Sequence, residues 1–239
     1  MLKEGEMQTD NNVKCWLFDR CNHIDCGKDY CARRFKLEHL YENALLSDKQ
    51  RSPIRLFLDS DHADETVFVR LKNIERAVVD FVRSGKNLYM YSPTCGVGKT
   101  SWAVRLAQAY LNDPRVWAKS SIEESPVLFV SVPQYLLALK ANISEKNEYA
   151  THIKNNIFDA DLVIFDDIAT KTTTPFESEN LLSIIDQRIA SGKSCVFTSN
   201  LSKAELQQSL GDRLTSRIFN YSECLQFKGK DKRAIAKED

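Results

Sequence analysis

Residues 93–100 have the types and spacing needed to hold a polyphosphate. In loops of the pattern G-x-x-x-x-G-K-[ST], successive backbone N–H groups and the N-terminus of the next helix surround the phosphates. Lys99 is placed to reach the β- and γ-phosphates, and the Thr100 hydroxyl is placed to hold Mg²⁺. The sequence therefore predicts a site for ATP and Mg²⁺. The residues of this loop are Pro93, Thr94, Cys95, Gly96, Val97, Gly98, Lys99 and Thr100.

The loop departs from the pattern at Pro93, where a glycine is expected. Proline fixes φ and removes one N–H donor, so the start of the loop must differ from the usual turn. A Gly-Lys-Thr tripeptide alone also occurs in surface turns. Here it lies between an apolar run and a helical pattern, which favours nucleotide binding.

Two carboxylates, Asp166 and Asp167, follow the apolar run 162–165. Ligands of parallel α/β sheets bind outside the carboxyl ends of the strands, so both side chains are expected to face the phosphates. Asp166 is placed to hold Mg²⁺, and Asp167 is placed to orient or deprotonate the attacking water. An Asp-Asp pair is also typical of a surface turn after a strand. The phosphate loop upstream favours the functional interpretation.

Further polar groups, Ser199 and Asn200, follow the next apolar run, 194–198. The Asn200 amide is placed to hydrogen-bond the γ-phosphate or the water, although an isolated asparagine is more typical of a turn. Downstream, Arg213 and Arg217 are four residues apart on a predicted helix, and Arg233 lies in a charged run. Arginines stabilise phosphoryl charge in the transition state, in cis or from a neighbouring subunit. Taken singly, each is more typical of a solvated surface charge.

Four cysteines near the N-terminus have the spacing C-x5-C-x4-C-x4-C. Four thiolates suit a closed, structural zinc site, and a segment this short needs metal binding to fold. The same donors also suit an iron–sulfur cluster, and unligated cysteines are small apolar residues. His23 can replace one cysteine as a ligand. The predicted zinc ligands are Cys15, Cys21, Cys26 and Cys31.

Alternating strand and helix patterns must position these groups. The strands are expected at 87–91, 126–132, 161–165, 194–198 and 224–227, with helical patterns at 33–46, 71–81, 102–111, 135–139 and 181–189. Strands this apolar are buried on both faces, which is typical of a parallel sheet in a three-layer α/β domain. The polar stretch 47–66 contains Pro53 and indicates a boundary. We expect a cysteine-rich, zinc-binding helical module at 1–50, a linker at 51–65 and an ATPase domain at 66–239.

The composition excludes several protein classes. Of 239 residues, 43% are hydrophobic and 28% are charged, which excludes a wholly disordered chain. Lys plus Arg equals Asp plus Glu at 33 each, which disfavours a DNA-coating protein that binds by charge alone. No run approaches the ~20 apolar residues of a membrane span, and the first 14 residues lack a secretory core. A cytoplasmic protein is expected.

These motifs together resemble the AAA+ ATPases of the DnaC/DnaI helicase-loader group, which is related to the IstB transposition helpers. The resemblance extends from about Leu71 onward. It rests on the order of phosphate loop, Asp-Asp strand end, Thr-Ser-Asn strand end and arginine-rich final helix. The front module also resembles the cysteine-rich, helicase-binding head of DnaI-like phage loaders.

The resemblance implies a role for each site residue. Asp167 stands where many AAA+ proteins carry glutamate, and its carboxylate is one methylene shorter, so slow hydrolysis is expected. Arg213 is a second choice for the arginine finger. The implied roles are Walker A for Lys99 and Thr100, Walker B for Asp166 and Asp167, sensor 1 for Asn200, arginine finger for Arg217 and sensor 2 for Arg233.

The resemblance also implies partners: an AAA+ oligomer of this chain, a DnaB-type ring helicase bound by the front module, and single-stranded DNA. The DNA track is expected to include Lys140, Lys146 or Lys154, which are equally consistent with a solvated face. Three alternatives stay open. They are an IstB-like ATPase that targets DNA in transposition, a small-molecule P-loop kinase, and an adaptor that uses ATP as a switch without hydrolysing it.

Overall fold

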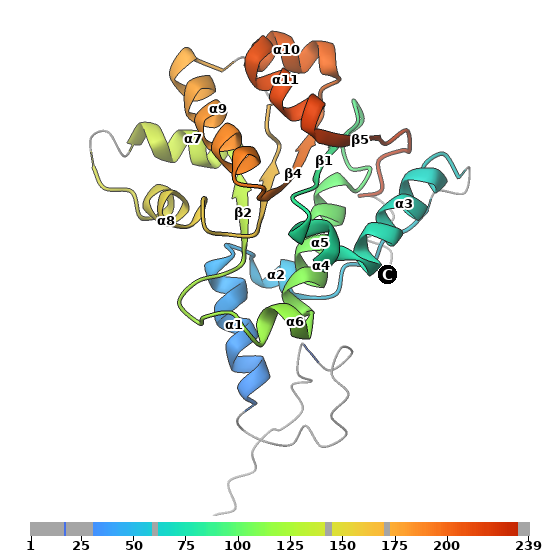
Figure 1. Ribbon diagram of the computed structural model, residues 1–239. Coiled ribbons are helices and arrows are strands. Elements are labelled where there is room, and N and C mark those ends of the chain that lie inside the picture. The colour runs from blue at the N-terminus through green and yellow to red at the C-terminus, as the bar shows by residue number, and fades with distance from the viewer. Residues whose placement is uncertain (1–16, 18–30, 59–61, 142–144, 170–172, 234–239) are drawn as a thin grey trace, which may run out of the picture.

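The computed structural model describes Leu17 and residues 31–58, 62–141, 145–169 and 173–233. The described residues form a parallel sheet of five strands between two layers of helices (Figure 1). The strands are β1 (Asn87–Tyr91), β2 (Val127–Ser131), β3 (Leu162–Asp166), β4 (Ser194–Ser199) and β5 (Ser222–Gln226). The helices are α1 (Ala32–Asn43), α2 (Asp48–Arg51), α3 (Glu65–Arg76), α4 (Val78–Arg83), α5 (Lys99–Asn112), α6 (Pro114–Trp117), α7 (Val132–Ala141), α8 (Glu148–Asn156), α9 (Pro175–Ala190), α10 (Lys203–Leu210) and α11 (Asp212–Tyr221).

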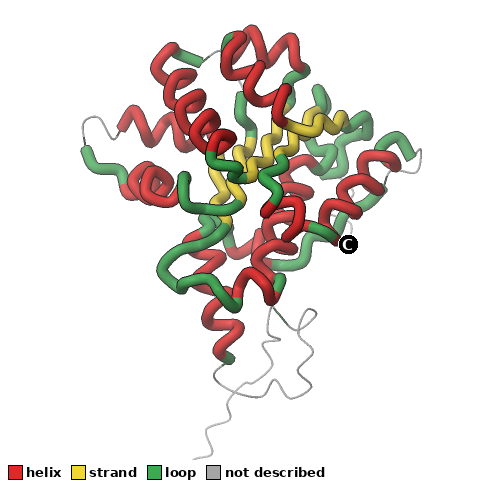
Figure 2. Tube along the Cα trace, in the orientation of Figure 1, coloured by secondary structure: helices red, strands yellow, loops and turns green. Residues whose placement is uncertain are grey.

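Strands β1 to β4 are apolar because helices cover both faces of the sheet (Figure 2). The edge strand β5 is partly exposed and carries Ser222, Glu223 and Gln226. Successive side chains of a strand point to opposite faces. Leu88 and Met90 belong to the apolar cluster that contains residues of α1, α3, α4, α5 and α6, whereas Tyr89 belongs to the cluster that contains residues of α7 to α11. The predicted three-layer α/β architecture with a parallel sheet is therefore confirmed.

The strand order, β2-β3-β4-β1-β5, determines which chemical groups can meet. Strand β4 lies between β1, which precedes the phosphate loop, and β3, which ends at Asp166. Because all five strands are parallel, their carboxyl ends share one edge of the sheet. Residues that follow β4 are thus positioned to contact both the phosphate loop and Asp166.

Some helices differ from the sequence-based expectation. The pattern over 71–81 forms two helices, α3 and α4, because the backbone leaves the helical region at Ala77. At the start of the polar stretch 47–66, the short helix α2 begins at a capping box between Ser47 and Gln50. Helices α6, α8 and α10 were not anticipated.

Helix α1 shares the core of the helical layer around α5. Leu37, Leu40 and Tyr41 are fully buried in this core. The carbonyl of Ala44, just after α1, accepts a hydrogen bond from the Phe129 N–H of the outermost strand, β2, at 2.8 Å. Removing α1 would therefore remove apolar contacts from this core.

No helix among the described residues is long and apolar enough to cross a membrane.

The packing of α1 predicts a large stability effect for Leu40→Ala. Loss of this fully buried side chain should lower the free energy of unfolding by about 3 kcal/mol, as for other buried leucines. Denaturant titration followed by circular dichroism measures the change. Leu137→Ala is the matched control, since Leu137 is 69% exposed and should change stability by less than about 0.5 kcal/mol. Equal stability of the two variants would contradict the packing of α1 described here.

Candidate active site

The phosphate loop joins β1 to α5 and turns on two glycines with left-handed backbone. Gly96 has φ +74° and Gly98 has φ +105°, and α5 begins immediately afterwards at Lys99. Residues with a Cβ rarely adopt these angles, so glycine is needed at both positions. At the start of the loop, the Thr94 N–H donates to the Ser92 hydroxyl at 3.1 Å. The proline-containing start is thus closed by a side chain.

The Lys99 side chain is buried against the neighbouring strand end. Its ammonium donates to Asn200 Oδ1 at 2.8 Å and to the Thr94 carbonyl at 3.3 Å. Burial lowers the pKa of Lys99, since desolvation disfavours the charged form. The structure thus brings together the predicted phosphate-binding lysine and the predicted sensor asparagine, which are 101 residues apart in the sequence.

Asp166, at the end of β3, accepts two hydroxyl hydrogen bonds on one carboxylate oxygen. Thr100 Oγ1 donates to Asp166 Oδ1 at 2.8 Å, and Thr198 Oγ1 donates to the same atom at 2.7 Å. Burial raises the pKa of Asp166, and the hydrogen bonds from Thr198 and Thr100 partly offset the rise. A hydroxyl and a carboxylate side by side are the oxygen donors that Mg²⁺ takes in phosphoryl-transfer sites, so the residues present fit that ion.

Asp167 has an unusual backbone conformation, with φ +52°. Non-glycine residues with positive φ are uncommon and cluster at functional sites. The Asp167 N–H donates to Thr198 Oγ1 at 2.9 Å, and the next N–H, of Ile168, donates to the Thr198 carbonyl at 3.0 Å. Strand β4 thereby holds the turn that directs Asp167 toward the phosphate loop.

Several of the predicted residues line a pocket of about 180 Å³ at the carboxyl edge of the sheet, whereas Asp166 contacts the lining residue Thr100 without lining the pocket itself. It is lined by Gly96, Gly98, Lys99, Thr100, Ser101, Asp167, Asn200 and Arg233. Lys99, Thr100, Asp167 and Asn200 come from three different strand ends, so only the folded chain assembles this pocket. Its polar lining is suited to phosphates and their counter-ion.

Other predicted residues lie elsewhere. Arg213 and Arg217 are exposed on α11 and do not line this pocket. Arg217 forms an ion pair with Asp186 of α9 at 2.5 Å, whereas Arg213 has no such partner within the described ranges. Among the four front cysteines, only Cys31 lies inside those ranges, at the N-cap of α1. The described part of the chain contains no cluster of three or more His, Cys, Asp or Glu residues suited to a metal.

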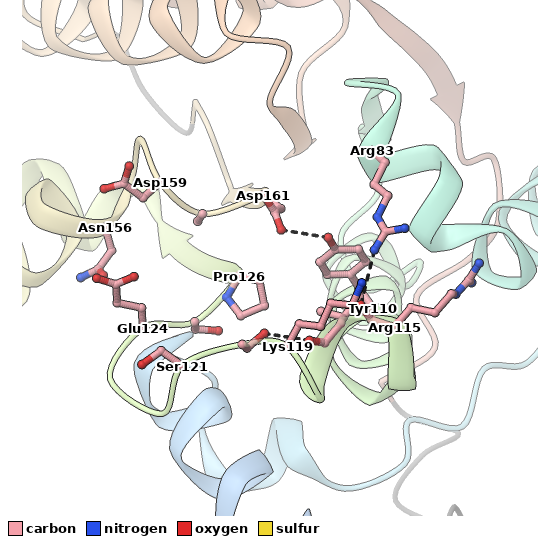
Figure 3. Close-up of a pocket in the computed structure, with 14 residues that line it drawn as sticks. Arg83, Tyr110, Arg115, Lys119, Ser121, Glu124, Pro126, Asn156, Asp159 and Asp161 are labelled. Atoms are coloured by element: carbon pink, nitrogen blue, oxygen red, sulfur yellow. Dashed lines mark hydrogen bonds between the residues drawn. The ribbon is translucent and has the colours of Figure 1, made fainter.

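A larger pocket, of about 330 Å³, lies at the opposite, amino-terminal edge of the sheet (Figure 3). Pro126 and Asp161, which precede β2 and β3, line it. Arg83 and Lys119 line one side, and Asp159 lines the other. Its mixed charges and its place away from the strands' carboxyl ends make it a poor phosphate site.

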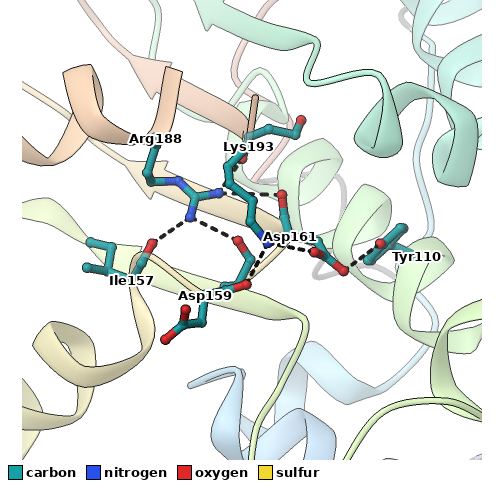
Figure 4. Close-up of polar contacts among 8 residues, drawn as sticks. Tyr110, Ile157, Asp159, Asp161, Arg188 and Lys193 are labelled. Atoms are coloured by element: carbon teal, nitrogen blue, oxygen red, sulfur yellow. Dashed lines mark hydrogen bonds and ion pairs between the residues drawn. The ribbon is translucent and has the colours of Figure 1, made fainter. Parts of the chain in front are cut away.

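A buried guanidinium stabilises that opposite edge (Figure 4). Arg188 is 1% exposed and donates to the backbone carbonyls of Ile157, Ala160 and Ser194. It thereby satisfies carbonyls on the segments that lead into β3 and β4, which would otherwise be buried without donors. These hydrogen bonds stabilise the amino-terminal edge of the sheet, whereas the candidate active site lies at the carboxyl edge.

Sequence reasoning did not assign a role to Thr198. Its hydroxyl contacts the Asp166 carboxylate and the Asp167 N–H. The sequence feature that points to Thr198 is its position as a polar residue near the end of an apolar strand. The end of that strand is expected to lie at the same edge of the sheet as the carboxylates.

The chain matches the family model of IstB-like ATP binding proteins over residues 57–238. This match covers most of the chain and includes the whole pocket. The chain belongs to the IstB-like ATP-binding protein family.

This family member is similar to helicase loaders. A segment of 130 residues is 25% identical to the replicative helicase loader DnaC of Escherichia coli strain K12, covering 54% of this chain and 49% of that protein. The chain thus spans about half the length of the curated relatives it matches. The crystal structure of the DnaC helicase loader has a TM-score of 0.58 at 19% identity, covering 80% of this chain and 99% of that chain. The crystal structure of DnaI has a TM-score of 0.54 at 23% identity, covering 75% of this chain and 91% of that chain. The two likenesses to solved structures show that the chain shares their fold.

The environment of Asp166 predicts opposite effects of Asp166→Asn on stability and on metal binding. Burial penalises the charged carboxylate, whereas an amide oxygen still accepts from Thr100 and Thr198. At neutral pH the nucleotide-free variant should be at least as stable as the wild type, with a gain of up to about 1 kcal/mol. It should lose the Mg²⁺-dependent increase in ATP affinity.

Thermal unfolding and ATP titration with and without Mg²⁺ measure the two effects. Ser101→Ala, a change in the same pocket, is the control and should retain the Mg²⁺ effect. An Asp166→Asn variant that keeps the full Mg²⁺ effect would exclude Asp166 as a metal ligand.

Proposed function

We propose that this protein is an ATP-dependent loader that places a DnaB-type replicative helicase on single-stranded DNA during replication initiation. The observation that carries the proposal is the convergence of Lys99, Thr100, Asp166, Asp167 and Asn200 at one edge of an AAA+ sheet. The similarity to the loader DnaC supports the choice among the many tasks that this fold performs.

Nucleotide binding is assigned to the phosphate loop and the end of β3. The backbone N–H groups around Gly98 and the N-terminus of α5 surround the phosphates. Lys99 would neutralise charge on the β- and γ-phosphates. Thr100 and Asp166 would hold Mg²⁺, which would supply further positive charge to the phosphates. The other members of the loop, Pro93, Thr94, Cys95 and Val97, set its path.

Hydrolysis is assigned to Asp167 and Asn200. Asp167 orients or deprotonates the attacking water, and Asn200 reports on the γ-phosphate as sensor 1. The Lys99 ammonium donates to Asn200 Oδ1. Phosphate binding would draw the ammonium away and release the amide for the γ-phosphate or the water. The exchange couples occupancy of the loop to the sensor.

Oligomerisation is assigned to the exposed arginines of α11. A finger acts on the site of the neighbouring subunit, which agrees with the distance of Arg213 and Arg217 from the pocket of their own subunit. Arg217 is the first candidate, and its ion pair with Asp186 would have to open in the assembly. Arg213 is the second. Arg233 acts within its own subunit as sensor 2, because it already lines the pocket.

The front module is proposed to bind zinc and the helicase. Cys15, Cys21, Cys26 and Cys31 are the ligands, and the division into a module at 1–50, a linker at 51–65 and an ATPase domain at 66–239 stays part of the proposal. Helix α1 would connect the module rigidly to the ATPase core, since its apolar face is buried there. Helicase docking and ATP binding are thus mechanically linked.

Single-stranded DNA is proposed to follow exposed lysines beyond the nucleotide pocket. Lys140 forms an ion pair with the buried Glu177 at 2.9 Å, so it is less free to bind a phosphate. Lys146 and Lys154 are exposed. They are the better candidates for backbone contacts.

The three alternative functions differ from the loader in the partner that they bind or in the reaction that they catalyse. An IstB-like ATPase that targets DNA in transposition would prefer duplex DNA and bind no helicase. A small-molecule kinase needs an acceptor site between β2 and β3, where the described residues instead form α7 and α8. An adaptor that uses ATP only as a switch would bind ATP without hydrolysing it.

Replacing Asp167 tests the hydrolytic assignment. Asp167→Asn should reduce ATP turnover by about 100-fold, because the carboxylate that activates water is lost, while ATP affinity changes little. Phosphate release measured at saturating ATP–Mg²⁺ gives the turnover. Asp159→Asn, at the opposite edge of the sheet, is the control and should hydrolyse ATP at the wild-type rate. Unchanged turnover in Asp167→Asn would remove the assigned role.

Co-migration with the replicative helicase of the same cell tests the loader assignment. In ATP–Mg²⁺, the full-length protein should form a complex with the helicase by light-scattering gel filtration and carry about one zinc per chain by elemental analysis. Cys26→Ser should lose the metal and the complex but still bind ATP. Cys224→Ser, at an exposed thiol of β5, should retain both. A wild-type protein with no complex in any nucleotide state and a duplex-DNA preference would favour the transposition alternative.

A further inference from the structure

Asp64 is a buried carboxylate whose partners are remote in the sequence. It occupies the N-cap of α3 and is 2% exposed, yet its side chain caps no N–H of that helix. Instead, it accepts hydrogen bonds from the N–H groups of Lys228 at 2.6 Å and Gly229 at 3.1 Å. An N-cap aspartate normally accepts from its own helix, so this carboxylate serves a different segment.

That segment, residues 227–233, is here named the C-terminal strap. It begins where the Phe227 N–H donates to the Tyr91 carbonyl at 2.9 Å, at the end of β1. It then passes Asp64 and reaches the phosphate loop, where the Lys232 N–H donates to the Gly96 carbonyl at 3.1 Å. The strap therefore crosses from α3 to the nucleotide pocket.

The strap lies directly against the phosphate loop. A Cβ built on Gly96 would meet Asp231 Oδ1 at 1.8 Å, so the approach depends on glycine. The same Asp231 oxygen accepts from the Arg233 N–H at 2.9 Å, which fixes the last turn of the strap. Arg233 then lines the pocket beside Lys99.

We propose that Asp64 is a positioning residue for nucleotide recognition: its carboxylate anchors the C-terminal strap and thereby holds Arg233 at the phosphate pocket. The inference deepens the proposed ATP-dependent function and rests on it. A carboxylate that accepts two adjacent N–H groups forms charge-assisted bonds, which are stronger than bonds between neutral groups. The Lys232 ammonium adds a second side-chain anchor, since it donates to the Phe57 carbonyl at 2.9 Å.

Anchoring of Arg233 by the strap is expected to affect ATP binding and ADP binding differently. Arg233 and Lys99 line the same pocket. A guanidinium beside the lysine that reaches the β- and γ-phosphates favours ATP over ADP. Releasing the strap should therefore weaken ATP binding more than ADP binding.

The test is a double-mutant cycle on the full-length chain, with ATP–Mg²⁺ and ADP–Mg²⁺ affinities measured by isothermal titration calorimetry. Asp64→Asn should lower the ratio of ATP to ADP affinity by about tenfold, the size of one charge-assisted contact. Arg233→Ala should lower it by a similar factor. In the Arg233→Ala background, Asp64→Asn should have no further effect on the ratio. Asp159→Asn is the matched exposed control and should keep the wild-type ratio.

Other outcomes would overturn the assignment. If Asp64→Asn leaves the ratio unchanged while the wild type binds ATP, Asp64 has no positioning role and the proposed function stands. If it weakens ATP and ADP equally in both backgrounds, Asp64 acts only through the fold. A wild type that binds no ATP defeats the proposed function as well. If Asp64→Asn does not fold, Asp64→Glu, which keeps the charge but moves the oxygens, should lower the ratio in the same direction, and an unchanged ratio would also overturn the role.

Discussion

The Thr198 hydroxyl links the two carboxylate residues at the end of β3 to strand β4. It donates to the Asp166 carboxylate and accepts from the Asp167 N–H, so one oxygen on β4 fixes both the side chain and the turn at the end of β3. The same Asp166 oxygen receives the Thr100 hydroxyl from α5. Three elements thus meet at a single carboxylate atom, and the positions of Lys99 and Asn200 follow because they flank these contacts. The arrangement depends on the order β3-β4-β1, which places β4 between the two halves of the pocket.

The nucleotide-binding half of the site was predictable from local pattern. Apolar runs and glycine spacing depend on neighbours in the chain, so the strands and the phosphate loop were found within one or two residues. Asp64 and Thr198 were not found, because their roles come from partners 164 and 31 residues away. Helix α8 was also missed, since its polar face dominates and only Ala150 and Ile153 are buried. This helix is stabilised by its tertiary packing, which hydrophobic periodicity in the sequence does not reveal.

The two edges of the sheet are stabilised by different chemistry. At the amino-terminal edge, Arg188 is surrounded by backbone carbonyls and is almost wholly removed from water. At the carboxyl edge, Lys99 and Asp166 are buried charges whose pKa values are shifted toward neutrality. The Arg188 cation is hydrogen-bonded to fixed backbone carbonyls and therefore stabilises the fold at that edge. Burial of Lys99 and Asp166 instead lowers the stability of the fold, as is common for groups of a binding site. The fold thus concentrates its adaptable groups at one edge.

The hydrogen bond from the Phe129 N–H to the Ala44 carbonyl protects one edge of the sheet. Strand β2 is the last strand on its side of the sheet, and an open strand edge is a template onto which foreign chains can add. Here the N–H groups that point outward from β2 are already engaged. Phe129 donates to Ala44, Val127 donates to the Ser125 hydroxyl at 3.2 Å, and the backbone of Ser131 bonds the Tyr149 hydroxyl. The segment after α1 thus covers the middle of this edge, and the edge is closed to the addition of a further strand there.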